Sequence, residues 1–442
     1  MRRPASDPRL AAYRILKEVE AGAFADRAAP AHLGGLSPRD RSFARELAYG
    51  CVRLRARLDG ELARLADCPL SRLERPVLLW LRLGLYQIRE LRVPDHAAVH
   101  RSVGGARRCA GPGAGRFVNA VLRAALRGEA GAEVFPPLED DPVGHLTTYG
   151  SHPEWLVRRW LERWPVMRVA RLVELDNRPP PLTLRLLEEE SCASAARKLA
   201  GTKARLEPLG PWPRSCRLVA GDPGEVLRCV SAVVQDPAAS AVVEYAGGAL
   251  RGPVLDVCAA PGGKSVAAAW QAPEARPYVA GDLSRERLAR ARVAAQRVGV
   301  ELLFAVMDGR RPPMKGATTV LLDVPCTGTG TLRRRPDLRW RAAPERLVEL
   351  VVLQRELLNA AARLVPPGGR LVYSTCSVEP EENERQIMEF LNRHTGFVRE
   401  SPGVPDLPAG LLTAEGDLRI LPWQHETDGG YAARLRRESD PR

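Results

Sequence analysis

The chain has 442 residues, of which 45% are hydrophobic and 27% are charged, the composition of a soluble globular protein of several domains. No apolar run approaches the roughly 18 residues that a membrane-spanning helix needs, so we expect no membrane partner. The 66 basic and 53 acidic side chains leave a formal net charge of +13, which favours a nucleic acid as partner. Arginine replacing lysine in a GC-rich genome would give the same excess.

Nine cysteines are spread over the chain, none in the Cys-x-x-Cys spacing, and no His-Glu-x-x-His motif occurs. This pattern argues against a structural zinc site, and we expect no metal. Nine is an odd number, and no secretory leader follows MRRPASDPRL. These two features favour reduced thiols in a cytoplasmic protein.

Residues 1–128 are expected to form an all-α bundle, because apolar residues recur there at helical spacing. One helix start is well marked: Ser37 is a plausible N-cap, Pro38 occupies the first helical position and Asp40 lies in the first turn. Residues 129–149 are rich in proline, glycine and acidic side chains, which predicts a linker.

Residues 150–234 are expected to form a small middle domain. It is helical around PEWLVRRWLERW, after which short β-like runs alternate with the helix-like SAARKLAG, a pattern that indicates an α+β fold. From residue 235 to 442, buried strands alternate with helices. The strands read PVLDVC, YVAGD, LLFAV, TTVLLD and RLVYST. This alternation predicts a parallel, doubly wound α/β sheet with ligands at the carboxyl ends of its strands.

The turn CAAPGGKS after the first of these strands has two interpretations. Gly262 and Gly263 allow a tight turn, and Lys264 at the start of the next helix suits an anionic group. A P-loop nucleotide hydrolase is one reading, although it needs glycine where Cys258 stands. Pro261 also removes a backbone donor from the phosphate cradle. We therefore favour the second reading, an adenosyl cofactor.

Acidic residues stand at or just after the ends of three successive strands. Asp256 would face the methionyl end of an adenosyl cofactor, Asp282 would accept from both ribose hydroxyls, and Asp308 would accept from the adenine amino group. Each one alone could be a helix N-cap. All three together favour the cofactor.

Cys326 follows the fourth strand and Cys376 the fifth, so neighbouring strand ends would place both thiols in one cleft with Asp323. Either cysteine alone could be a buried, inert thiol. Beside a methyl donor, however, the pair suits methylation of cytosine. A thiolate adds to carbon 6, and carbon 5 then attacks the methyl group. An acid at N3 assists, and a second thiol helps with release.

Three motifs, DVCAAPGGKS, DVPCTGTGTLRRRPDLRW and YSTCSVEPEEN, together resemble the two-cysteine RNA 5-methylcytosine methyltransferases. ARELAYG, LRLGLYQI, VPDHAAVH and FVNAVLR resemble the NusB-like domain of the bacterial RsmB/Sun-type subgroup, and SHPEWLVRRW, RPPPLTLR and QDPAAS resemble its middle region. The resemblance covers nearly the whole chain. It implies a multidomain protein with a NusB-like RNA-binding bundle, a ferredoxin- or RRM-like middle domain and a Rossmann-like class I methyltransferase domain.

By the same resemblance, S-adenosylmethionine is the cofactor and a cytosine of 16S ribosomal RNA is the substrate. Cys376 matches the nucleophile, Cys326 the thiol that assists release, and Asp323 the acid at the cytosine edge. The positions that match cofactor contacts are Cys258, Ala259, Ala260, Pro261, Gly262, Gly263, Lys264, Asp282, Arg287, Asp308 and Asp323. Two positions depart from the family pattern: RPPPLTLRLL has leucine where Val-Asn is frequent, and Gly430 stands where an aromatic is usual.

The run from Arg333 to Trp340 is expected to contact phosphates and to offer a stacking ring, with a solvated loop and a packed tryptophan as the alternative. The target base is expected to be single-stranded or flipped out, and the protein to be a monomer. Two other functions stay open: the same chemistry on another RNA such as tRNA, and a non-catalytic RNA-binding factor.

Overall fold

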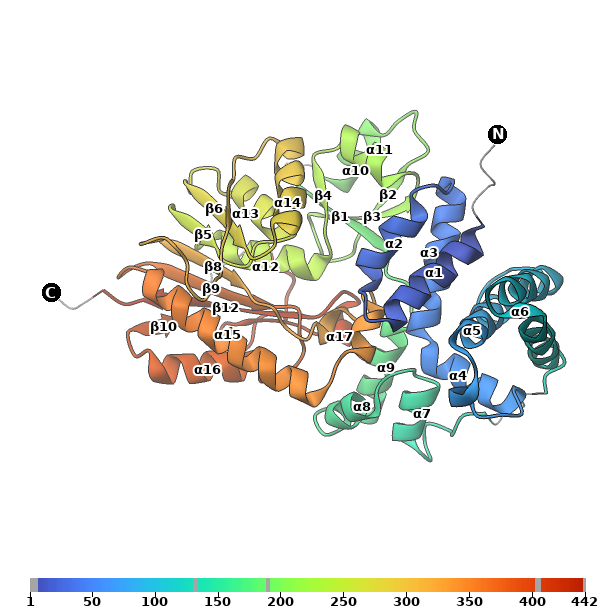
Figure 1. Ribbon diagram of the computed structural model, residues 1–442. Helices are drawn as coiled ribbons and strands as arrows, with labels where there is room; N and C mark the ends of the chain where they lie inside the picture. The colour runs from blue at the N-terminus through green and yellow to red at the C-terminus, as the bar shows by residue number, and fades with distance from the viewer. Residues whose placement is uncertain (1–6, 130–133, 188–190, 402–406, 440–442) are drawn as a thin grey trace. The chain divides into compact units, whose positions relative to one another are not determined.

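The computed structural model describes residues 7–129, 134–187, 191–401 and 407–439 (Figure 1). The chain forms two compact units. The first, a helical unit, consists of Met1–Pro179 and Leu332–Ala342, and the second, a sheet unit, of Pro180–Thr331 and Ala343–Arg442. Within the described ranges, no helix is both long and apolar enough to cross a membrane, and no group of three metal-ligating side chains gathers.

The helical unit begins with six helices, which confirms the predicted all-α start of the chain. They are α1 (Pro8–Glu20), α2 (Ala25–Leu33), α3 (Pro38–Arg53), α4 (Arg55–Leu65), α5 (Arg75–Arg89) and α6 (Asp95–Leu126). The predicted start of α3 is also confirmed, because the Ser37 hydroxyl accepts the backbone N–H of Asp40 at 3.1 Å. Helix α6 is kinked at Gly111, which has a φ of 88° and precedes Pro112.

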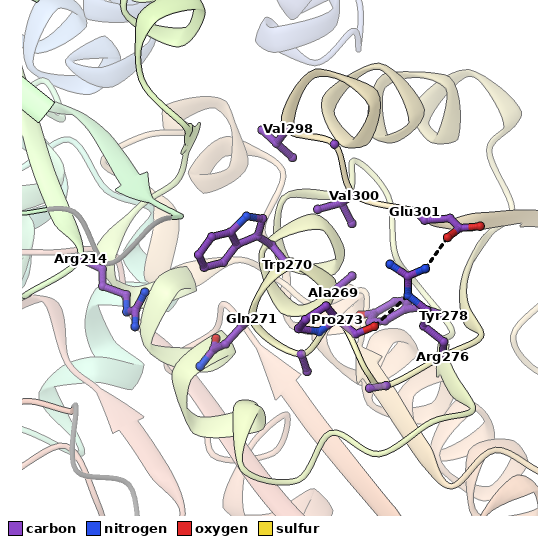
Figure 2. Close-up of a pocket in the computed structure, with 13 residues that line it drawn as sticks. Arg214, Ala269, Trp270, Gln271, Pro273, Arg276, Tyr278, Val298, Val300 and Glu301 are labelled. Carbon is purple, nitrogen blue, oxygen red and sulfur yellow. Dashed lines mark hydrogen bonds and ion pairs between the residues drawn. The ribbon is translucent and has the colours of Figure 1, made fainter. Parts of the chain in front are cut away.

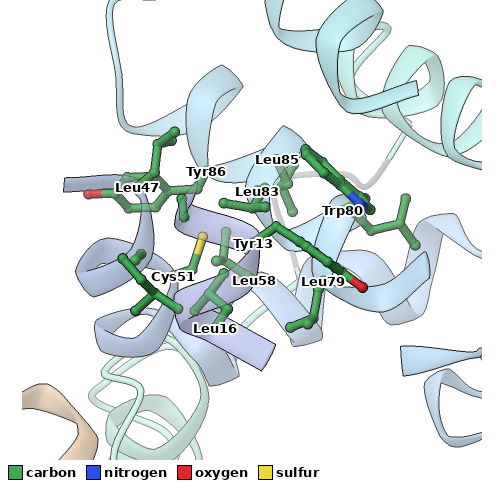
Figure 3. Close-up of a cluster of buried hydrophobic side chains, with 14 of the residues drawn as sticks. Tyr13, Leu16, Leu47, Cys51, Leu58, Leu79, Trp80, Leu83, Leu85 and Tyr86 are labelled. Carbon is green, nitrogen blue, oxygen red and sulfur yellow. The ribbon is translucent and has the colours of Figure 1, made fainter. Parts of the chain in front are cut away.

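Helices α1, α3, α4 and α5 supply the side chains of the buried cluster drawn in Figure 3. Tyr13 of α1 stacks on Trp80 of α5 with 5.2 Å between ring centroids. Two glycines make room for aromatic rings: a Cβ at Gly50 would lie 2.0 Å from Tyr86, and one at Gly105 would lie 2.3 Å from Trp80. Full burial of a large apolar side chain stabilises a fold by about 1.5–3 kcal/mol, so this cluster holds the helices together.

Three shorter helices complete the helical unit: α7 (Pro142–Thr148), α8 (Glu154–Leu161) and α9 (Val166–Asp176). Helix α7 lies inside the segment whose composition predicts a linker. Asp141 caps it by accepting the N–H of Gly144 at 2.8 Å, and Pro142 follows at the first position. Proline and acid therefore mark a helix start there. The described part of 150–179 groups with the N-terminal helices.

The short segment Leu332–Ala342 also belongs to the helical unit. Its Arg339 side chain has an exposed fraction of 0%. It donates to the backbone oxygens of Arg53, Ser151 and Asp176 and to Oδ1 of Asn177. Trp340 donates its indole N–H to the Val52 oxygen at 2.7 Å. The predicted phosphate contact is therefore wrong for Arg339, because its buried guanidinium cannot reach a phosphate. Trp340 is a packed tryptophan, as in the alternative prediction.

The sheet unit begins with a small antiparallel sheet in the order β2-β3-β1-β4. Its strands are β1 (Leu182–Leu186), β2 (Arg205–Pro208), β3 (Ser215–Ala220) and β4 (Ala232–Val234). Its helices are α10 (Cys192–Lys198) and α11 (Pro223–Cys229). The chain order β-α-β-β-α-β is that of a ferredoxin-like fold, which confirms the predicted α+β class.

A second, eight-stranded sheet has the order β10-β12-β9-β8-β5-β6-β7, with β11 paired to β12. Its strands are β5 (Val254–Asp256), β6 (Tyr278–Asp282), β7 (Leu303–Val306), β8 (Thr319–Asp323), β9 (Arg370–Thr375), β10 (Phe397–Arg399), β11 (Leu418–Ile420) and β12 (Gly430–Arg437). Strands β5 to β9 are the five predicted ones and run parallel, as expected. The predicted parallel sheet is extended by strands that the sequence pattern did not indicate, and the first of these, β12, pairs antiparallel with β9.

Helices cover both faces of this sheet (Figure 1). They are α12 (Pro237–Gly247), α13 (Gly263–Gln271), α14 (Arg285–Val298), α15 (Pro344–Leu364), α16 (Glu384–Arg393) and the short α17 (Pro422–His425). Side chains alternate along each strand. In β8, Val320 and Leu322 join a core with α15 and α16, whereas Leu321 joins a core with α12, α13 and α14. The two cores fix the strand ends where the chemistry lies.

Candidate active site

Two thiols meet at the carboxyl ends of adjacent parallel strands. Strand β8 pairs with β9 so that Asp323 lies opposite Ser374, and Cys326 and Cys376 follow these strand ends. The two sulfur atoms are 3.3 Å apart. This separation is too long for a disulfide, whose sulfurs lie about 2.05 Å apart, and suits a thiol hydrogen bond. The structure therefore brings the two predicted thiols together.

The two thiols are not equivalent. The hydrogen bond with Cys376, burial and the charge of Cys376 raise the pKa of Cys326 well above its usual value. A raised pKa suits Cys326 to act as the donor in the contact between the two sulfur atoms, in which either thiol can donate. The candidate active site thus holds two thiols in hydrogen-bond contact, one of them with a raised pKa.

Asp323, at the end of β8, is held on one side only. Its Oδ1 accepts from Nζ of Lys264 at 2.6 Å and from the hydroxyl of Ser374 at 2.8 Å. Burial by itself would lower the pKa of Lys264, but Asp323 and the two cysteines raise it, and the net direction is upward. Oδ2 of Asp323 has no hydrogen-bond partner among the described residues, and 35% of the side chain is exposed. That oxygen is available to a substrate.

The glycine turn between β5 and α13 has the shape of a ligand cradle. Gly262 has a φ of 97°, and a Cβ there would lie 2.3 Å from that of Ala291, so both conformation and space require glycine. Helix α13 then begins at Gly263 with its first backbone N–H groups free for a ligand. Burial raises the pKa of the Cys258 thiol, which therefore stays neutral beside this turn.

Asp256 and Asp282 lie behind the same turn. Asp256 is buried: its Oδ2 accepts from the Ser265 hydroxyl at 2.6 Å, whereas its Oδ1 has no partner. Burial raises the pKa of Asp256 to about 7. Asp282 accepts the N–H groups of Ala260 at 3.2 Å and Ser284 at 2.8 Å. These carboxylates therefore shape the turn and also leave acceptor capacity for a ligand.

Arg287 contributes to the turn from α14. Its guanidinium donates to the backbone oxygen of Ala260 and lies 3.7 Å from Asp282. Its position suggests support of the turn, a role that the sequence motif left unassigned. Asp308, just after β7, is paired with Arg310 at 2.8 Å, and the hydrogen bonds from Arg310 lower its pKa. The sequence pattern did not reveal that arginine partner.

The strand order places these acidic residues in a row. Since β8, β5, β6 and β7 are successive neighbours, Asp323, Asp256, Asp282 and Asp308 follow one another along the carboxyl edge. A small void of about 20 Å³ lies beside Lys264, Asp323, Asp256 and Ser374, enough room for one water. A glycine cradle, free helix N–H groups and an unpartnered buried oxygen fit an adenosyl cofactor.

Gly430, where the resemblance leads us to expect an aromatic side chain, starts β12. A Cβ at this position would lie 3.3 Å from the backbone oxygen of Thr375, the residue before Cys376. Nearby, the backbone N–H of Gly330 donates to the backbone oxygen of Cys376 at 3.0 Å. The backbone oxygen of Gly330 accepts from the N–H of Gly429 at 2.7 Å. This departure therefore touches the backbone that carries the nucleophile candidate and leaves the thiol pair in place.

Sequence reasoning missed a network behind the thiols. Glu382 accepts from the backbone N–H of Thr327 at 2.8 Å and from Nε2 of Gln354 at 2.9 Å. Ser377 bonds the Thr327 and Thr329 hydroxyls at 3.2 and 3.1 Å. The only signal was the acidic run after Cys376, which the pattern assigned to a helix start.

A larger cavity of about 510 Å³ lies at the amino edge of the same sheet (Figure 2). Trp270, Tyr278 and Arg214 are among the residues that line it, and Tyr278 is the first residue of β6. Its charges are largely balanced, because Arg276 lies 2.5 Å from Glu301. Despite its size, this cavity holds none of the predicted catalytic or cofactor-binding residues.

Comparison with known proteins agrees with this architecture. A family model described as 16S rRNA methyltransferase RsmB/F matches residues 251–436. A NusB family model matches residues 6–127, and a model of the RsmF/B-like ferredoxin-like domain matches residues 152–215. The ribosomal RNA small subunit methyltransferase B of Erwinia tasmaniensis is 33% identical, covering 96% of this chain and 97% of that protein. Its counterpart from Klebsiella pneumoniae subsp. pneumoniae is 32% identical with the same coverage of both chains.

Solved structures show the same fold. The crystal structure of PH0851 has a TM-score of 0.77 at 23% identity, covering 99% of this chain and 100% of that one. A methyltransferase homologue from Pyrococcus horikoshii has a TM-score of 0.54 at 25% identity, covering 67% of this chain and 98% of that one. With three domain models matched in order and relatives above 30% identity over nearly its whole length, the chain belongs to the RsmB/F family of S-adenosylmethionine-dependent RNA methyltransferases.

Proposed function

We propose that this protein transfers a methyl group from S-adenosylmethionine to carbon 5 of a cytosine in 16S ribosomal RNA. The observation that carries the proposal is the thiol pair, 3.3 Å apart, beside the half-tethered carboxylate of Asp323. The names of the relatives support small-subunit ribosomal RNA as the substrate. The net charge of +13 suits such a polyanion.

Cys376 is the nucleophile of this proposal. Carbon 5 of cytosine is a weak nucleophile, so the thiolate first adds to carbon 6, forming a C6–S bond and moving the ring electrons towards N3. Lys264 and Ser374 donate hydrogen bonds to Oδ1 of Asp323 and hold that oxygen in place. Oδ2 then faces the cytosine edge, where a protonated carboxyl group would donate to N3. Lys264 holds the other carboxylate oxygen in place.

Cys326 assists the second half of the reaction. After methylation, carbon 5 loses its proton to a base and the C5–C6 double bond forms again. The C6–S bond breaks, and its electron pair returns to the sulfur of Cys376. The thiol of Cys326, already within 3.3 Å, stabilises that leaving thiolate by hydrogen bonding. The raised pKa of Cys326 supports this role, because the group must be neutral to donate.

S-adenosylmethionine supplies the methyl group when bound. The residues proposed to hold it are the turn Cys258–Lys264, which contains Ala259, Ala260, Pro261, Gly262 and Gly263, together with Asp282, Asp308 and Asp323. Asp282 would accept from the ribose hydroxyls. Asp308 would accept from the adenine amino group, sharing its carboxylate with Arg310. Arg287 would keep the turn in shape.

The direct test is methyl transfer from tritiated S-adenosylmethionine to unmodified 16S ribosomal RNA by wild type and Cys376→Ala in parallel. We expect label in 5-methylcytosine with wild type only. Label on another nucleotide, or equal labelling by the variant, would overturn the proposal. Unmodified tRNA serves as the competing substrate, and light scattering checks the expected monomer.

A further inference from the structure

A buried carboxylate that the proposed chemistry does not use lies directly behind the Cys326 loop. Glu382 precedes α16 and has an exposed fraction of 0%. Its Oε1 accepts from the backbone N–H of Thr327 at 2.8 Å and from Gln354 at 2.9 Å, and its Oε2 accepts from the Thr327 hydroxyl at 2.5 Å. Thr327 is the residue after Cys326, so two of these hydrogen bonds hold the loop that carries this thiol, and the third ties Glu382 to α15.

The contacts of Glu382 are those of an ionised carboxylate. A backbone N–H and an amide N–H can only donate, and the short Thr327 hydroxyl contact suits a charged acceptor. Burial raises the pKa of Glu382, and the hydrogen bonds from Ser377, Thr327 and Gln354 oppose that shift. The Tyr373 hydroxyl donates to its backbone oxygen. Among the described residues no basic side chain pairs with Glu382, so its charge is held by neutral donors alone.

The two sulfurs lie in an uneven field. The Lys264 ammonium is near enough to both that their charges raise its pKa, and the effect of Cys376 is larger than that of Cys326. The charge of Glu382 acts in the other direction and contributes to the raised pKa of Cys326. Lys264 thus favours negative charge on Cys376, and Glu382 disfavours it on Cys326.

We propose that Glu382 is a positioning residue that assigns different roles to the two thiols. Its hydrogen bonds fix the Cys326 loop, and its charge keeps Cys326 as the neutral partner, so that Cys376 supplies the thiolate. The use of this asymmetry in catalysis rests on the proposed methylation mechanism. The asymmetry itself exists in the protein without RNA or cofactor, and it can be measured separately.

The experiment is alkylation of the full-length protein by iodoacetamide across a pH series, with each cysteine quantified by peptide mass spectrometry. In wild type, Cys376 is expected to be labelled before Cys326. In Glu382→Gln, the labelling midpoint of Cys326 should move down by roughly 1 pH unit, because a like charge beside it is removed. The ratio of Cys326 to Cys376 labelling should rise accordingly.

The matched control is Glu381→Gln, the same charge change at the neighbouring residue, whose carboxylate pairs with Arg385 at 2.7 Å. It should leave both midpoints unchanged. Glu382→Asp keeps the charge with a shorter side chain, so its Cys326 midpoint should stay near that of wild type. A purely structural role would instead make the Asp and Gln variants alike.

Two results would overturn the inference: an unchanged or higher Cys326 midpoint in Glu382→Gln, or labelling of Cys326 before Cys376 in wild type. The second needs no variant and stands even where Glu382→Gln does not fold. Because alkylation uses neither RNA nor S-adenosylmethionine, an unchanged Cys326 midpoint in Glu382→Gln overturns the role of Glu382 and leaves the proposed methylation intact. Conversely, loss of the methylation proposal would leave the measured thiol asymmetry standing.

Discussion

The two edges of the large sheet differ in how their polar groups are paired. At the amino edge, a cavity of about 510 Å³ has Arg276 paired with Glu301. At the carboxyl edge, a void of only about 20 Å³ lies among a lysine, two aspartates and a serine, and Asp256 keeps an oxygen without a partner. The larger cavity is therefore not the one beside the predicted reactive residues, because reactivity depends on polar groups that the fold leaves without partners.

The largest expected difference between the edges is in catalysis. Cys376→Ala should lower methyl transfer to 16S ribosomal RNA by roughly 10³-fold or more, because it removes the covalent step. Trp270→Ala, which enlarges the amino-edge cavity, should change the same rate by less than about threefold. Initial rates with tritiated cofactor measure both. A large loss in Trp270→Ala would break the comparison by giving the amino edge a catalytic role.

Two aspartates sharpen the comparison within the carboxyl edge. Asp323→Asn should lower kcat by roughly 10²–10⁴-fold at saturating cofactor, because an amide cannot supply a proton at the cytosine edge. Asp308→Asn should mainly raise the KM for S-adenosylmethionine. Steady-state kinetics separate the two effects. An unchanged kcat in Asp323→Asn would remove this residue from the chemistry.

Asp256 predicts a pH dependence of stability. Burial raises its pKa from 3.8 to about 7, so the folded state binds this proton more tightly than the unfolded state. The contribution is therefore most favourable below pH 4 and is lost as the pH rises to about 7. Asp256→Asn keeps an acceptor for Ser265 and cannot ionise. Its urea midpoint should fall less than that of wild type between pH 5 and 8. The same fall of the midpoint with pH in both proteins would show that ionisation of buried Asp256 does not affect stability.

The smallest effect is expected from the amino-edge ion pair. The Arg276 and Glu301 side chains are 55% and 72% exposed, so water screens their attraction. Arg276→Ala should change the free energy of unfolding by less than about 1 kcal/mol. Urea titration measures this change, and a loss of several kcal/mol would show that the amino edge depends on this pair.

Much of the carboxyl edge could be predicted from sequence. Each buried parallel strand is a short apolar run, and the polar residues or cysteines of the site stand at its end or just after it. Asp256, Asp282 and Asp323 are strand ends in the structure, and Cys326 and Cys376 meet as expected. The antiparallel pairing of β12 with β9 was not predicted, because β12 is not among the five strands that the sequence pattern indicated.

Long-range polar contacts could not be read from the chain. Arg339 is separated by 286 residues from the Arg53 oxygen that it bonds, so local sequence shows only an arginine in a basic run. Glu382 is 55 residues from Thr327, and the acidic run around it indicated only the start of a helix. In both cases the fold buries a charged side chain and gives it several partners that lie far away in the sequence.

The central claim is a covalent bond between Cys376 and carbon 6 of a cytosine in 16S ribosomal RNA. Cys326→Ala should slow release, so incubation with labelled RNA and S-adenosylmethionine should leave a slowly migrating protein–RNA band on a denaturing gel. Digestion of that band should yield the nucleotide attached to the Cys376 peptide, and the double variant Cys326→Ala/Cys376→Ala should show no band. A band that persists in the double variant, or active methylation by Cys326→Ala with no adduct, would contradict the proposed roles of the two thiols.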